Sequence, residues 1–307
     1  MPSPSALQRL WDHDVAWSFR RSPVTIVASS VALAILAGAL LAPWLAPHNP
    51  YDPGSLSLVD AFKPPAWSED GTARFLLGTD DQGRDVLSTI LHGTRISLLV
   101  SVSATLIAVV AGVLLGLLSG YLGGAFDAFV MRVVDVQLSF PAILIALLVD
   151  GVARALLPPE AHGGALALLV LILAIAFSDW VQFARTVRGS TLVEKNKEYV
   201  QAARVIGRHA LAIMLRHVLP NVMGPVLVIA TIRFGLAIIT EATLSFLGVG
   251  VPPTTPSLGT LIRVGNDFLF SGEWWVTVFP GLTLVMLVLS VNLVGDWLRD
   301  ALNPKLR

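Results

Sequence analysis

Long stretches without a charged side chain constrain this chain more than any other feature. Three of them, residues 24–47, 96–126 and 274–295, each exceed the roughly 20 residues that a helix needs to cross a hydrocarbon core of about 30 Å. Inside lipid the backbone must satisfy its own hydrogen bonds, so such stretches fold as helices and not as open strands. Only 14% of the 307 residues are charged, against about 25% in soluble domains. The sequence therefore predicts an all-α, polytopic membrane protein.

The apolar pattern predicts about six transmembrane helices. They cover roughly 24–46, 94–121, 126–149, 164–186, 222–247 and 274–298. The third has a charge-free core of only 14 residues, 136–149, a length that also fits a re-entrant segment. Arg132 and Asp135 lie three residues apart, where they could pair on one helical face, and this favours a span. A short interfacial helix over 5–20 is expected before the first span.

The basic residues predict the orientation. With the N-terminus inside, cytoplasmic segments hold 14 of the 21 Lys and Arg residues, external segments hold six, and Arg233 lies within a span. Positive residues concentrate on the cytoplasmic side of membrane proteins. Both termini and the basic segment 187–220 are therefore expected in the cytoplasm, and the polar segments 48–93 and 249–273 outside.

Glycines recur every four residues from the second predicted span onward, at Gly112, Gly116, Gly120 and Gly124. Small residues at this spacing leave a groove where another helix backbone can approach closely. Packing inside the chain's own bundle is favoured over a specific dimerisation motif.

The composition excludes several kinds of site. The chain has no cysteine, which removes disulfides, thiolate metal ligands and a cysteine nucleophile together. It has neither a Gly-x-x-x-x-Gly-Lys-[Ser/Thr] phosphate loop nor a His-Glu-x-x-His zinc motif. Its net charge is zero, so nothing draws it to nucleic acid. We expect no catalytic site, no metal site and no cofactor in this chain.

The segment 198–220 is the most informative part of the sequence. At 3.6 residues per turn, one face carries the polar and basic residues and the opposite face carries Tyr199, Ala203, Ile206, Ala210 and Ile213. Gly207 interrupts the helical pattern and predicts a turn, and Pro220 is expected to stop the second helical stretch. An amphipathic helix lying on the inner membrane surface is the alternative.

Four motifs in this chain resemble those of one membrane-protein family. Gln201-Ala202-Ala203, Gly207 and Leu219-Pro220 are similar in spacing to the EAA loop (Glu-Ala-Ala, three residues, Gly, nine residues, Ile-x-Leu-Pro) of ABC importer permeases, with Gln201 in place of Glu and His217 in place of Ile. The stretches 77–87, 241–259 and 295–304 are also similar to the dipeptide, oligopeptide and nickel subgroup. The likeness covers roughly residues 70–304.

The resemblance implies a type I importer permease fold with a cytoplasmic coupling helix that docks on an ATPase. Its residues here would be Glu198, Gln201, Ala202, Ala203, Arg204, Gly207, Arg208, Leu219 and Pro220. Ala202, Ala203 and Gly207 would form a small-residue docking surface, and Arg204 and Arg208 would contact acidic groups or lipid head groups. The chain would comprise a cytoplasmic interfacial helix (1–23), a first transmembrane helix with its external segment (24–93) and a permease core (94–304) that contains the coupling loop 187–221.

The same resemblance implies the partners. They are a homologous permease, two ATPase subunits that bind ATP and Mg²⁺, an external solute-binding protein and membrane lipid, in a bacterial inner membrane. This chain would form half of the pore for peptides or similar small solutes.

Polar residues at membrane depth are candidates for the solute pathway, because they are costly to place in lipid. We single out Asp135, Gln137, Arg233 and Glu241, and we expect Glu241 or Arg233 to face a central cavity. A secondary transporter is the main alternative, but no internal repeat is evident. A channel subunit would need a filter-like segment, and an intramembrane enzyme would need a catalytic pairing.

Overall fold

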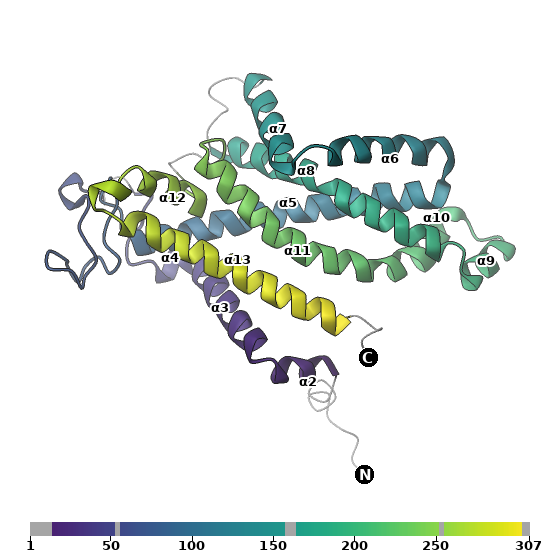
Figure 1. Cartoon of the computed structure of the whole chain (residues 1–307), viewed down its shortest axis with the longest axis horizontal. Coiled ribbons are helices and arrows are strands. Elements are labelled where there is room, and N and C mark those ends of the chain that lie inside the picture. Colours follow the sequence, from purple (N-terminus) through teal and green to yellow (C-terminus); the bar gives the residue numbers. More distant parts are fainter. Residues whose placement is uncertain (1–13, 53–55, 157–163, 252–254, 303–307) are drawn as a thin grey trace, which may run out of the picture.

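The computed structural model describes residues 14–52, 56–156, 164–251 and 255–302, and in this part the fold is helical, with one isolated bridge between Thr79 and Asp85. The helices are α2 (Asp14–Arg21), α3 (Pro23–Leu40), α4 (Ala42–Leu45), η2 (Leu58–Asp60), α5 (Val86–Leu122), α6 (Gly124–Leu138), α7 (Ala142–Leu156), α8 (Gly164–Glu194), α9 (Glu198–Val205), α10 (Ala210–Ile213), η4 (Met214–Val218), α11 (Leu219–Phe246), α12 (Leu258–Asn266), η5 (Leu269–Ser271) and α13 (Trp275–Leu302). Figure 1 shows α5, α8, α11 and α13 running lengthwise through the molecule.

The glycine repeat of α5 brings this helix against α8. A Cβ atom on Gly116 would lie 2.5 Å from the Ala184 carbonyl oxygen and 2.9 Å from the Val187 Cβ atom. Gly112 and Gly120 face the same helix at similarly short range. The predicted packing inside the chain's own bundle is confirmed for these three glycines. Gly124 differs, because it faces open space with a φ of +63° where α6 begins.

The helix α5 begins earlier than the apolar pattern predicts. Asp85 caps its N-terminus by accepting a hydrogen bond from the Ser88 backbone N–H at 2.9 Å. A turn precedes this helix, and Gly78 and Gly83 within it both have positive φ angles. The apolar pattern misses the first two turns because Ser88, Thr89 and His92 interrupt their apolar residues and the charged Arg95 follows.

The predicted third span, 126–149, is wrong as a single straight helix. Its residues form α6 and α7, which meet at an angle of 99° across a short break. Pro141 lies in the break; it lacks a backbone N–H and disfavours helical geometry in the preceding residue, which explains the bend. The predicted pairing of Arg132 with Asp135 is also wrong, because Asp135 pairs with Arg185 of α8. Five described helices are long and apolar enough to cross a membrane, or six if the bent pair counts as one span.

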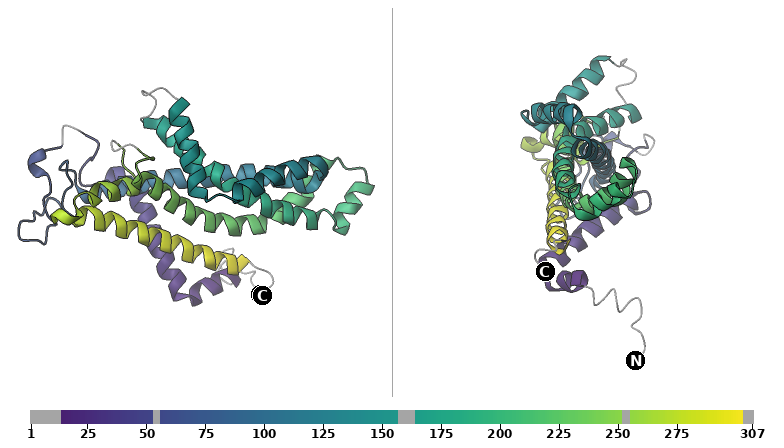
Figure 2. Two further views of the ribbon diagram at one scale, coloured as in Figure 1. Left: turned by 45° about the horizontal axis from the view of Figure 1, so that its top comes forward. Right: turned by 90° about the vertical axis from the view of Figure 1, so that its right-hand side faces the viewer.

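Two groups of short elements lie at the two ends of the long bundle. The turns of residues 56–85 and α12 lie at one end, and α9 and α10 lie at the other (Figure 2). The helix α2 forms the described part of the predicted interfacial helix, and residues 5–13 of that prediction lie outside the described residues. Pro252, Pro253 and Pro304 of the family motifs lie outside them as well.

Candidate functional site

The predicted turn at Gly207 ends the helix α9. Gly207 has a φ of +80°, which L-residues with a side chain rarely adopt. Its backbone N–H donates to the Arg204 carbonyl at 2.9 Å, and the Arg208 N–H donates to the Ala203 carbonyl at 3.1 Å. These two bonds form a Schellman motif, the arrangement in which a left-handed glycine closes a helix C-terminus. The turn at Gly207 is confirmed.

The inner face of α9 is fixed to the end of the bundle. Val200 is fully buried and Ala203 nearly so, both in the core that α5, α8 and α11 share. Tyr199 links the neighbouring helices, because its hydroxyl donates to the Glu194 carboxylate and accepts from the Asn221 Nδ2 at 3.1 Å. Desolvation, with the Glu194 hydrogen bond in support, raises the pKa of Tyr199 to about 12, so the hydroxyl remains a donor at physiological pH.

The outer face of α9 ends in an exposed aliphatic tip. Val205 is 88% exposed and Ile206 is 78% exposed, side by side at the end of the molecule. Gln201, Ala202 and Arg204 on the helix are also exposed. Adjacent exposed aliphatic side chains, rimmed by polar ones, are typical of a surface that binds another protein. We name Gln201, Ala202, Arg204, Val205, Ile206, Gly207 and Arg208 the α9 tip.

Two predicted roles within this segment are wrong. Ala203 cannot form part of a docking surface, because its side chain is buried in the chain's own core. Ile206 does not lie on the buried face, because the helix ends at Val205 and the 3.6-residue period does not extend through the turn. Sequence reasoning thus missed Val205 and Ile206 as tip residues. The signal that could have found them is their position just before a glycine that ends a helix.

Pro220 does not stop a helix, contrary to the prediction. The chain stays helical from Ala210 to Phe246, and Pro220 lies in the first turn of α11. The preceding turn, η4, is π-helical, and the wider backbone turn accommodates a residue without an N–H. Of the other predicted coupling residues, Glu198 is exposed on the first turn of α9 and Leu219 is half-buried.

Two of the predicted pathway residues lie on α6 and differ in role. Gln137 is buried; its Nε2 donates to the Phe177 carbonyl at 2.6 Å, and its Oε1 accepts from the Trp180 Nε1 at 3.2 Å. These contacts make Gln137 a link between α6 and α8 and leave it no open surface. Asp135 is exposed and pairs with Arg185.

The other two pathway candidates lie on α11 and also separate. Glu241 is fully buried, and its Oε1 accepts from the Ser245 hydroxyl, one turn further along the same helix, at 2.8 Å. Its side chain therefore has no exposed surface within this chain. Arg233 is half-buried and pairs with Asp179 of α8 at 3.4 Å. Arg233 and Asp135 remain the candidates with access to a pathway.

Sequence reasoning missed a further ion pair, which joins α6 to α8 near α9. Asp127 of α6 accepts two hydrogen bonds from the Arg188 guanidinium, at 2.5 and 2.6 Å, and a third from Ser119. Lys195 donates to the Gly120 carbonyl at 2.6 Å. No sequence spacing would have paired residues 61 apart. Among the residues that the structure describes, no three His, Asp or Glu side chains form a group that could hold a metal ion.

Comparison with known proteins places the chain among membrane transport components. The family model described as "Binding-protein-dependent transport system inner membrane component" matches residues 112–307, and one described as "N-terminal TM domain of oligopeptide transport permease C" matches residues 9–65.

Curated relatives match nearly the whole chain. The di/tripeptide transport system permease protein DppC of Pseudomonas aeruginosa is 40% identical over 99% of this chain and 94% of its own length. The dipeptide transport system permease protein DppC of Escherichia coli K12 is 42% identical over 98% of this chain and 94% of its own length. A solved chain of the MetNI methionine ABC transporter, in an inward-facing conformation, has a TM-score of 0.54 at 19% identity over 70% of this chain and 96% of its own, a likeness of fold.

Proposed function

Because this chain belongs to the family of inner membrane components of binding-protein-dependent transport systems, we propose that it forms half of an import pore for dipeptides or similar small peptides. The alignment supports this proposal, since it covers almost all of this chain and of relatives that are named as dipeptide permeases. A homologous permease would complete the pore, and an external solute-binding protein would deliver the peptide at the end that carries α12.

The proposal for coupling rests on the exposed α9 tip. Val205 and Ile206 offer an aliphatic surface to a groove on a separate ATPase subunit, and Arg204 and Arg208 offer positive charge beside it. Two such subunits, and not this chain, bind ATP with Mg²⁺ and hydrolyse the ATP. Closure of the ATPases displaces α9, and its buried inner face passes the displacement to α8 and α11 as rigid bodies. In this arrangement the tip and both termini lie in the cytoplasm.

The solute pathway is proposed to run along the exposed side of α6, α8 and α11. Asp135 and Arg233 are its candidate polar residues, because each combines charge with accessible surface. Glu241 and Gln137 lie inside the fold instead: Glu241 bonds Ser245 of its own helix, and Gln137 links α6 to α8.

A matched pair of substitutions tests the coupling role. Val205→Asp changes the tip, whereas Val59→Asp changes a valine that is equally exposed (87% against 88%) in the segment at the other end of the molecule. Tagged protein is purified from native membranes in mild detergent, and the co-purifying subunits are identified by mass spectrometry. We expect wild type and Val59→Asp to retain ATPase subunits and a second permease, and Val205→Asp to lose the ATPases alone.

Two results would contradict the proposal. Equal retention of the ATPases by both variants would show that the tip is not the docking surface. Purification of the wild-type chain without any ATPase would favour a secondary transporter or a channel subunit.

A further inference from the structure

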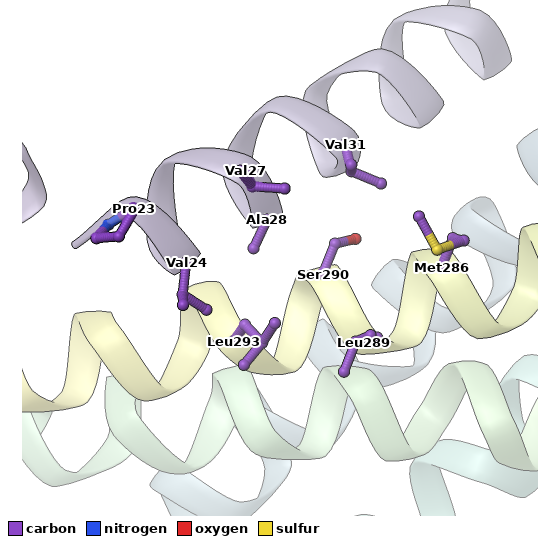
Figure 3. A pocket seen from close by; sticks show the side chains of 9 residues that line it. All are labelled: Pro23, Val24, Val27, Ala28, Val31, Met286, Leu289, Ser290 and Leu293. Atoms are coloured by element: carbon purple, nitrogen blue, oxygen red, sulfur yellow. The ribbon is translucent and has the colours of Figure 1, made fainter.

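A narrow apolar groove runs between the first half of α3 and the second half of α13 (Figure 3). Its volume is about 360 Å³, and it is lined by Pro23, Val24, Val27, Ala28 and Val31 of α3 and by Met286, Leu289, Ser290 and Leu293 of α13. The single polar side chain is Ser290, whose hydroxyl donates to the Leu287 carbonyl of its own helix at 2.9 Å. Ser290 is also buried, at 3% exposure, so the surface that the groove presents to an occupant is aliphatic and favours a hydrocarbon.

The dimensions of the groove fit one extended hydrocarbon chain. Pro23 and Val31 are eight residues apart, which is about 12 Å along a helix. Over this length the groove is lined by apolar side chains of two helices, so an extended acyl chain can lie along it.

Two arginines stand next to one end of this groove. Arg20 and Arg21 are exposed and immediately precede Ser22 and Pro23, where α3 begins. The Arg21 guanidinium lies 4.2 Å from the centre of the Trp17 ring, which is itself exposed. Exposed tryptophan is typical of the head-group layer of a bilayer, and arginine beside it attracts anionic head groups.

The helix α2 that carries these arginines is held in place against α13. The rings of Phe19 and Trp297 meet edge to face with centres 5.2 Å apart, and the Trp297 Nε1 donates to the Ser18 hydroxyl at 3.4 Å. The arginines and the groove therefore keep a fixed relation. We propose that together they form a binding site for one anionic phospholipid, with an acyl chain between α3 and α13 and the phosphate on Arg20 and Arg21.

The proposal predicts a preference that depends on both the groove and the charges. The transporter complex is reconstituted in nanodiscs that contain phosphatidylcholine and a trace of a lipid with a photoreactive group in its acyl chain. The reactive lipid is either phosphatidylglycerol or phosphatidylcholine, and labelled peptides are found by mass spectrometry. We expect phosphatidylglycerol to label the peptides with residues 23–31 and 286–293 several-fold more than phosphatidylcholine does.

Matched variants separate the two parts of the site. Val27→Trp fills the groove, and Leu33→Trp places the same ring at an equally exposed position of α3 outside it. The double variant Arg20→Gln, Arg21→Gln removes the charges without touching a buried residue, and Arg95→Gln removes an exposed charge elsewhere. We expect Val27→Trp to abolish the labelling and the double variant to remove the preference for phosphatidylglycerol, with both controls unchanged.

Three outcomes would overturn the proposal. They are equal labelling by the two lipids, a preference that survives loss of both arginines, and groove peptides that stay unlabelled because another polypeptide of the complex covers them.

Discussion

The turn at Gly207 allows a test in which backbone strain alone is changed. The residue has a φ of +80°, and a Cβ atom there would meet nothing within 4 Å. A substitution therefore causes no clash, and its cost is that of forcing an L-residue into a left-handed conformation. That cost is about 1–2 kcal/mol for most residues, smallest for asparagine and largest for a β-branched residue.

This cost can be converted into an effect on ATPase binding. If the variant must adopt the left-handed turn to dock, a strain of about 1–2 kcal/mol lowers the affinity by roughly 5–30-fold. We expect Gly207→Asn to bind nearly as well as wild type, Gly207→Ala several-fold more weakly, and Gly207→Val most weakly. The assay measures the Kd of purified ATPase subunits for the permease pair in nanodiscs, together with the thermal midpoint of the permease.

The matched control is Gly272, at the other end of the molecule. It also has a positive φ, +111°, and a Cβ atom at this position would likewise meet nothing within 4 Å. Gly272→Val should carry a similar strain and leave the Kd for the ATPase unchanged. Wild-type affinity in Gly207→Val, or an equal loss in Gly272→Val, would refute the reasoning.

Three further predictions concern packing, hydrogen bonding and ionisation. Gly116→Ala should destabilise the permease by about 1–3 kcal/mol because α8 lies against that position. Gly189 faces open space, so Gly189→Ala should not destabilise it. Equal thermal midpoints of the two variants would argue against tight α5–α8 packing. Tyr199→Phe should weaken docking of α9 by about 0.5–1.5 kcal/mol. The folded-state pKa of Tyr199 is raised to about 12, so the stability that its hydroxyl contributes should be constant below about pH 10 and be lost as the pH rises toward 12. The ionisation is measured as the tyrosinate absorbance of the wild type minus that of Tyr199→Phe. Glu241→Ala should destabilise the permease by about 1–3 kcal/mol because it leaves the buried Ser245 hydroxyl without its acceptor, while Glu241→Gln costs less; similar melting of the two variants would contradict this.

Hydropathy predicted the helices because lipid permits little else, and it failed where the backbone departs from a straight span. The bend between α6 and α7 follows from Pro141, but a proline in an apolar run predicts neither the angle of 99° nor its direction. Pro220 shows the opposite error, because a π-helical turn keeps the chain helical where a stop is expected. In both cases the outcome depends on neighbouring helices that satisfy or displace the backbone, and a local pattern does not contain them.

The candidate site was predictable where a single residue determines the backbone. Gly207 predicted a turn because glycine adopts a left-handed conformation at little cost. The faces of α9 were less predictable, because periodicity assumes a helix that continues. It assigns Ile206 to the buried face, although the helix ends before this residue. The ion-pair partner of Asp127 is Arg188, 61 residues away on another helix, so this role could not be read from spacing.

The helix that leaves the α9 segment links the two ends of the molecule. From Ala210 the chain is helical for 37 residues, about 55 Å, and near its far end the Ala242 backbone lies against Gly259 of α12, where an added Cβ atom would be 2.3 Å from the Ala242 carbonyl oxygen. A displacement of α9 would therefore reach α12 through one continuous helix. Because the chain has no cysteine, spin labels can be placed at Ile206 and at Phe270, both strongly exposed. We expect a non-hydrolysable ATP analogue to change the environment of both labels in the assembled transporter, and a response at Ile206 with none at Phe270 would show that the helix does not transmit the motion.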